Sequence, residues 1–164
     1  MIRNGENAGA LARWRSTMTA WAARPHFWAL VTALAAGLVY LSTLQWGING
    51  SQSPYATDVG EIQNALPRWG TIHFTGYPAY TLLGSLFVSL LRLLRVEPAA
   101  ACSLYSALWA MLTISLLVLL SITLGAPHPL AALSGMLAAV TASFWIDASL
   151  AEVHTMSAAL TVAT

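Results

Sequence analysis

Two acidic side chains stand three residues apart in the segment TDVGEIQNA, at Asp58 and Glu61. Residues three or four apart lie on one face of a helix, so a helical segment here would present both carboxylates together. A positioned carboxylate can act as a general base toward a hydroxyl group, and its pKa rises near apolar surface, which makes it a better base. The alternative is a solvated polar loop in which neither side chain has a chemical role.

A second polar group occupies the segment DASLAEVHT at 147–155, just after an apolar run. Glu152 and His154 could bind a substrate. Together with Asp58 and Glu61 they could also ligate a divalent cation, because carboxylate and imidazole groups are metal ligands. The spacing matches no recognised metal signature, so no cofactor is assigned and a divalent cation is the one candidate. The alternative is that this segment only anchors the end of a span, and Asp147 is expected to be a helix-end residue.

Positive groups that could meet a phosphate occur at His73, Arg92 and Arg95, and Arg68 is a further candidate. Arg92 and Arg95 stand three residues apart, so a helix would place both on one side. Interfacial arginines also contact lipid headgroups without any catalytic role. Tyr77 could contact a sugar, although interfacial tyrosines commonly belong to the aromatic belt of a membrane protein.

The composition indicates that a membrane surrounds the elements that position these residues. Charged residues make up 8% of the 164 residues and hydrophobic residues 57%, whereas soluble domains have about 25% charged residues. No Asp, Glu, Lys or Arg occurs from 98 to 146. The single cysteine, Cys102, excludes an internal disulfide and a Cys-based zinc site, and the arginines lack the interleaved aromatic residues of a nucleic-acid-binding face. We therefore expect an all-α, polytopic integral membrane protein with no nucleic-acid partner.

Apolar runs predict where the chain crosses the membrane. They extend over about 27–46, 99–124 and 130–146, and a further run begins at 156. About 20 helical residues match the roughly 30 Å hydrocarbon core, and the first run is too long for a cleaved secretory signal. Because the last run stops at the end of the sequence, 26–164 is expected to be the N-terminal portion of a longer multi-span domain, inactive by itself.

The tail at 1–25 is expected to stay in the cytoplasm. It carries four of the seven basic residues, which are Arg3, Arg13, Arg15 and Arg24, and positive charge before a span favours the cytoplasmic side. The tail is either an amphipathic helix on the lipid surface or a disordered leader. With this orientation, in the cell (inner) membrane, the Gly-, Ser- and Pro-rich loop at 47–76 faces the outside. Within the loop, Thr57 could cap a short helix that ends at Pro67.

Residues 77–96 decide whether the two acidic segments face the same side. If this stretch crosses the membrane, Glu152 and His154 lie in the cytoplasm, opposite Asp58, and the arginines at its end favour that topology. If it lies on the outer surface, all the acidic residues of both segments share one face. Only 15 uncharged residues run from 77 to 91, which is short for a span and favours the surface helix. These criteria leave both topologies open.

Three separated motifs resemble a known family. They are Asp58-Val59-Gly60-Glu61, then Gly76-Tyr77-Pro78-Ala79-Tyr80, then Ala151-Glu152-Val153-His154. The chain, over about 27–164, resembles the domain of unknown function 2723 family, which is similar to transmembrane protein 260 and to protein O-mannosyltransferases of the GT-C glycosyltransferase superfamily. It departs from the family pattern at His73-Phe74-Thr75, where the family tends to have Pro-Pro after the His.

The resemblance implies a GT-C-like arrangement, with an extracytoplasmic first loop and 77–96 as a juxtamembrane surface helix. It implies an inverting membrane glycosyltransferase, which transfers a mannose-like sugar from a polyprenyl-phosphate-linked donor to a hydroxyl of an acceptor protein or glycan at the extracytoplasmic face. Asp58 would be the catalytic base, and Glu61 would hold the acceptor or orient Asp58. The substrate-binding residues would be His73, Tyr77, Arg92, Arg95, Glu152 and His154, and membrane lipids would surround the site.

Two other classes of protein are alternatives, a multi-span transporter and a non-catalytic membrane subunit. Transporters place ionisable residues within the membrane or break their helices at the binding site. In this sequence the ionisable residues stand at the ends of the apolar runs, and no Gly-Pro break interrupts those runs. This pattern favours chemistry at the membrane surface.

Overall fold

The structure is a computed structural model, and it describes residues 23–48 and 58–164. The predictions for most of the tail at 1–25 and for the Thr57 cap fall outside these ranges. Within them all regular structure is helical and there is no strand: seven α-helices and one 3-10 turn follow one another along the chain. The predicted all-α class is therefore confirmed.

Two helices are long and apolar enough to cross a membrane, α2 (Pro25–Ser42) and α5 (Pro98–Thr123). Each has a proline in its first turn. The N–H groups of the first turn have no partner within the helix, so the N–H that proline lacks costs no hydrogen bond. α5 has 26 residues and is therefore about 39 Å long, enough to span the hydrocarbon core. The two helices pack closely, because a Cβ atom at Gly37 would lie 2.7 Å from the Met111 sulfur.

The predicted apolar run at 130–146 is divided into two helices. α6 (His128–Ala139) and α7 (Ala142–Ser149) meet at an angle of 71°. Between them Thr141 is extended, with φ −63° and ψ 138°, and its hydroxyl donates to the Ala138 carbonyl at 2.8 Å. Threonine competes with the helix through such local hydrogen bonds, so the expectation of an uninterrupted helix here is wrong. Tyr40 donates to the freed Ala139 carbonyl at 3.2 Å.

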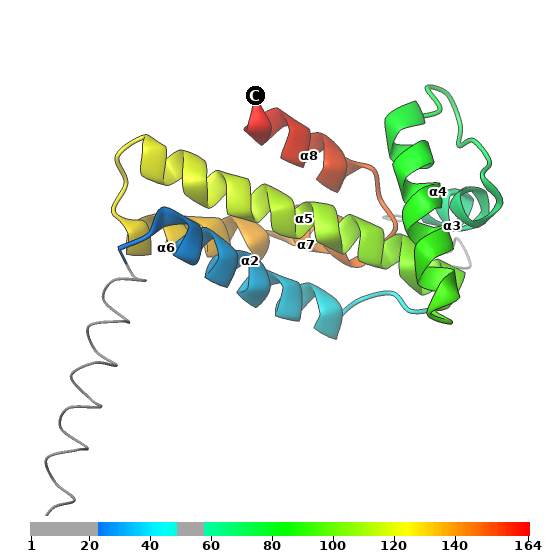
Figure 1. Ribbon diagram of the computed structural model, residues 1–164, viewed down its shortest axis with the longest axis horizontal. Helices are drawn as coiled ribbons and strands as arrows, with labels where there is room; N and C mark the ends of the chain where they lie inside the picture. The colour runs from blue at the N-terminus through cyan, green and yellow to red at the C-terminus, as the bar shows by residue number, and fades with distance from the viewer. Residues whose placement is uncertain (1–22, 49–57) are drawn as a thin grey trace, which may run out of the picture.

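Two further helices cap one end of the bundle, α3 (Val59–Ala65), which continues into the turn η1 (Leu66–Arg68), and α4 (Pro78–Leu93). α2, α5 and α6 run along the length of the molecule, whereas α4 lies crosswise to them (Figure 1). With 16 residues, α4 is about 24 Å long, shorter than the hydrocarbon core. It packs closely on its neighbours, since a Cβ atom at Gly84 would lie 2.9 Å from Leu66 Cδ1 and 3.1 Å from Tyr105 Cε1.

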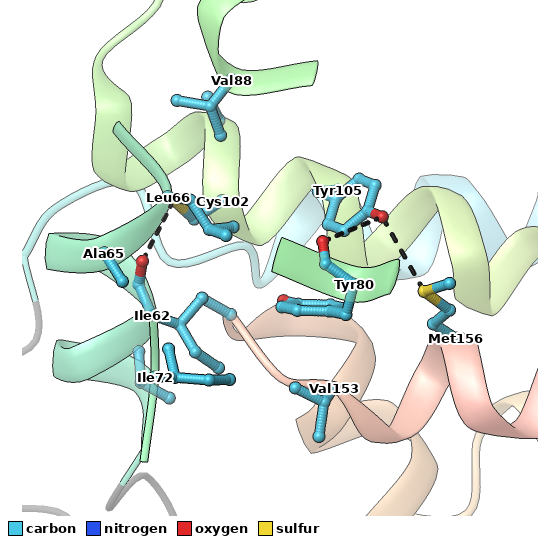
Figure 2. Close-up of a cluster of buried hydrophobic side chains, with 13 residues drawn as sticks. Ile62, Ala65, Leu66, Ile72, Tyr80, Val88, Cys102, Tyr105, Val153 and Met156 are labelled. Carbon is cyan, nitrogen blue, oxygen red and sulfur yellow. Dashed lines mark hydrogen bonds between the residues drawn. The ribbon is translucent and has the colours of Figure 1, made fainter. Parts of the chain in front are cut away.

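A buried cluster joins this cap to α5 and to α8 (His154–Ala163). Figure 2 shows the Tyr105 hydroxyl donating to the Tyr80 carbonyl at 3.5 Å and to the Met156 sulfur at 3.8 Å. The Cys102 thiol donates to the Ile62 carbonyl at 4.0 Å. The segment between α7 and α8 reaches the same end of the bundle (Figure 1). Chain segments almost a hundred residues apart therefore meet there.

Candidate functional site

The exposed acids are positioned by α3. Asp58 is its N-cap residue and Glu61 lies in its first turn, where negative charge is stabilised by the helix dipole. Val59 and Ile62 of the same helix are fully buried. This burial turns the two carboxylates away from the core.

His73 lies between the two carboxylates. Its Nδ1 atom is 2.7 Å from Glu61 Oε2, a hydrogen bond, and its Nε2 atom is 3.9 Å from Asp58 Oδ2. The hydrogen bond that the His73 ring donates to Glu61 raises the pKa of His73, and the charge of Asp58 raises it further. The protonated imidazole is thus favoured. The ring of Tyr77 meets His73 edge-on, with the ring centroids 6.0 Å apart.

The same three residues could hold a metal ion. One ligand atom each from Asp58, Glu61 and His73 fit within 4.8 Å of one another. Two carboxylate oxygens and an imidazole nitrogen suit a divalent transition metal. A metal needs the neutral imidazole, however, so it would compete with the proton that the Glu61 hydrogen bond favours.

Glu152 is held in a different way. Its side chain is buried, with 5% of the residue exposed. The Ser106 hydroxyl accepts from the Glu152 N–H at 2.9 Å and donates to the Glu152 carbonyl at 3.0 Å. Burial raises the pKa of the Glu152 carboxyl to about 7, with smaller contributions from the charges of Asp147 and Asp58. Val59 and Ile62 of α3 pack in one buried cluster with Ala151 and Val153, the neighbours of Glu152, so the two acidic segments lie close together.

The other predicted site residues are divided between two places. His154 is exposed and begins α8, next to the segment that carries Glu152. Arg92 lies almost four turns along α4 from Pro78, or about 21 Å, and Arg95 lies beyond it. Arg92 donates to the Pro67 carbonyl at 3.2 Å. The structure brings together Asp58, Glu61, His73 and Tyr77, and Arg92 lines a different pocket, together with Gln63 and Asn64 of α3.

A small apolar pocket lies between the second and third sequence motifs. Its volume is about 200 Å³, and Tyr77, Tyr80, Val153, Met156 and Leu160 are among its lining residues. The pocket touches the acid–histidine group through Tyr77, whose ring contacts His73. An apolar chain could therefore lie close to the exposed carboxylates.

Sequence reasoning did not identify Ser106 or the pairing of His73 with Glu61. A signal for Ser106 exists, because a hydroxyl inside a long apolar run needs a hydrogen-bond partner. No comparable signal exists for the pairing of His73 with Glu61, which depends on how the chain folds back after η1.

A model of a protein family matches most of the chain. The family is described as the protein O-mannosyl-transferase TMEM260 N-terminal domain, and the match covers residues 58–164. The match begins at Asp58 and includes all three sequence motifs. Neither the curated proteins nor the solved structures gave a match.

Proposed function

The chain belongs to the family of the protein O-mannosyl-transferase TMEM260 N-terminal domain, and we propose that it transfers a mannose-like sugar from a polyprenyl-phosphate-linked donor to an acceptor hydroxyl. The observation that carries this proposal is the group of Asp58, Glu61 and His73, held at one end of a bundle of membrane helices. A lipid-linked donor exposes its phosphate only at the membrane surface, so the catalytic groups must lie there.

The proposed topology has a cytoplasmic N-terminus and an extracytoplasmic site in the cell (inner) membrane, with α4 on the outer surface. The crosswise orientation of α4 and its 16-residue length support this arrangement (Figure 1). The packing of Val59 and Ile62 with Ala151 and Val153 in one buried cluster supports it as well, because it puts both acidic segments at the same end of the bundle. The orientation itself rests on the positive charge of the N-terminal tail.

In the proposed reaction, Asp58 is the general base. It takes the proton from the acceptor hydroxyl as that oxygen attacks the anomeric carbon of the sugar. The bond from this carbon to the phosphate oxygen breaks, and the phosphate leaves with the electron pair, which inverts the anomeric centre. A positioned base of this kind contributes about 10²–10⁴-fold to the rate.

The neighbouring residues have supporting roles in this proposal. Glu61 orients His73 through the 2.7 Å hydrogen bond, and the protonated His73 supplies positive charge near the departing phosphate. The apolar pocket beside Tyr77 would take the first part of the polyprenyl chain. Glu152 and His154 would contact the sugar or the acceptor from the facing segment.

A transporter is the second candidate, and the 71° bend between α6 and α7 favours it, because transporters build binding sites at broken helices. The bend carries no charged group, however, since no Asp, Glu, Lys, Arg or His occurs from 129 to 146. Its freed Ala139 carbonyl is also occupied by Tyr40. The acid–histidine group at the membrane surface therefore supports the transferase better.

The test is a transfer assay with the full protein in detergent and a polyprenyl-phosphate-linked mannose donor. Asp58→Asn should lower the rate by about 10²–10⁴-fold. The matched control is Glu97→Gln, which neutralises an exposed carboxylate at the start of α5, and it should leave the rate unchanged. An Asp58→Asn protein that transfers as fast as the wild type would refute the proposed base.

A further inference from the structure

α4 has an apolar face that no other element in the described part of the chain covers. The exposed leucines on it are Leu82, Leu83, Leu86, Leu90 and Leu93, with exposed fractions from 44% to 80%. The spacing of three and four residues puts most of them along one side of the helix. In a chain with membrane-crossing helices, such a face is expected to lie among lipid acyl chains.

A basic pocket lies at the C-terminal end of this helix. Its volume is about 380 Å³, and its lining includes Asn64, Pro67, Arg68, Arg92 and Pro98. No carboxylate is among its lining residues. Among the residues that the structure describes, the ion pairs are those of His73, so neither arginine is neutralised by a carboxylate there.

The geometry of the pocket favours a phosphate group. The Pro67 carbonyl fixes one guanidinium nitrogen of Arg92 at 3.2 Å, which orients the side chain while leaving its other N–H groups able to donate. Guanidinium groups match phosphate oxygens with pairs of N–H donors. Arg68 and the amide of Asn64 line the same space and could complete the coordination of the anion.

This pocket differs from the acid–histidine group, because none of Asp58, Glu61 and His73 is among its lining residues.

We propose that this pocket binds the phosphate of an anionic lipid headgroup, with Arg68 and Arg92 as its two cationic ligands. Leu90 and Leu93, which α4 exposes at the same end of the helix as the pocket, would contact the acyl chains of the same lipid. A soluble phosphate needs no apolar contact, so the basic pocket and these exposed leucines together select a lipid. The site would fix α4 at the level of the headgroups, and it does not depend on the proposed sugar transfer.

The experiment is native mass spectrometry of the full protein, purified in a neutral detergent and mixed with dioleoyl phosphatidylglycerol. Each guanidinium near the membrane surface contributes about 1 kcal/mol to binding an anionic lipid. Arg68→Gln and Arg92→Gln should therefore each weaken binding about fivefold, and the double variant about 30-fold. Dioleoyl phosphatidylcholine should bind weakly to all these proteins.

The matched control is Arg95→Gln, which removes a charge just beyond α4. Arg95 does not line the pocket, so this variant should bind phosphatidylglycerol like the wild type.

Two results would overturn the proposal. An equal loss of binding in Arg95→Gln and in the pocket variants would mean that only general surface charge attracts the lipid. Displacement of phosphatidylglycerol by millimolar inorganic phosphate would mean that the pocket takes a soluble anion. Both replaced side chains are exposed, so the variants should fold, and because no sugar transfer is measured, a failed transfer assay would leave this result unaffected.

Discussion

Two kinds of carboxyl group lie at the same end of the helix bundle. The side chains of Asp58 and Glu61 are 37% and 38% exposed, and both face the ring of His73. Glu152 is 5% exposed, and Ser106 holds it through its backbone. Burial favours the neutral form of Glu152 and raises its pKa.

This difference in exposure indicates that the two kinds of carboxyl group have different roles in the proposed site. The exposed carboxylates of Asp58 and Glu61 are open to a substrate, whereas the carboxyl group of Glu152 is buried. The exposed Asp58 can reach an incoming acceptor. With its pKa raised to about 7, Glu152 would carry less negative charge beside a donor phosphate than an ordinary carboxylate, and the Ser106 bonds to its backbone hold the segment between α7 and α8 in place.

The largest expected effect on folding concerns the anchor of the buried carboxyl. Ser106→Ala would leave the N–H and the carbonyl of Glu152 buried without this partner. Each of these two unsatisfied groups costs about 1–3 kcal/mol, so we expect a loss of about 2–6 kcal/mol in the free energy of unfolding, measured by chemical denaturation in detergent. Ser103→Ala is the matched control, because the Ser103 hydroxyl donates at 3.4 Å to the Ala99 carbonyl of its own helix. Equal effects of the two substitutions would mean that Glu152 is not specifically anchored.

A smaller effect should separate the two kinds of carboxyl by pH. The pKa of Glu152 is raised from 4.5 to about 7 in the folded state. Its contribution to stability is therefore fully present below about pH 4.5 and is lost as the pH rises to about 7. Glu152→Gln should gain about 1–3 kcal/mol over the wild type across this range, seen as a growing difference between the two melting temperatures. The exposed Glu97→Gln serves as the control, and a difference for Glu152→Gln that stays constant with pH would contradict the buried state of this carboxyl.

The smallest effect concerns the exposed pair. The Glu61 hydrogen bond is the main cause of the raised pKa of His73, so Glu61→Gln should lower that pKa toward its ordinary value. An NMR titration of the histidine ring signals measures it, with the His73 signal assigned from its loss in His73→Gln. If Glu61→Gln shifts the His73 pKa no more than Glu97→Gln does, the contact is not formed in the membrane protein.

The long apolar helix and the short helix after the first span were predictable from the hydropathy pattern of the sequence. The run predicted at 99–124 corresponds to α5 at Pro98–Thr123, and the short helix after the first span corresponds to α3 at Val59–Ala65. The break at Thr141 was not predictable, because no glycine or proline marks it and the competing hydrogen bond is visible only in the fold. An apolar composition indicates that a segment prefers lipid to water. It does not indicate whether the helix bends within the membrane.

The candidate site was predictable only as a list of residues. The spacing of Asp58 and Glu61 predicted a shared helix face, but their partner His73 comes from a later turn of the chain. The bond between Ser106 and Glu152 joins residues 46 positions apart. Such contacts depend on how the helices pack against one another. This packing cannot be predicted from the spacing of residues or from the composition of one segment.

The most direct test of the central claim, that both acidic segments face the outside, is thiol labelling of intact cells. Cys102 is replaced by Ala in the full protein, and single cysteines are introduced at the exposed positions Asn64 and His154, with Leu124 at the opposite end of α5 as the control. An impermeant reagent should label Asn64→Cys and His154→Cys in intact cells, and it should label Leu124→Cys only after the membrane is permeabilised. Labelling of Asn64→Cys without His154→Cys would show that residues 77–96 cross the membrane, and the two-segment site would then be wrong.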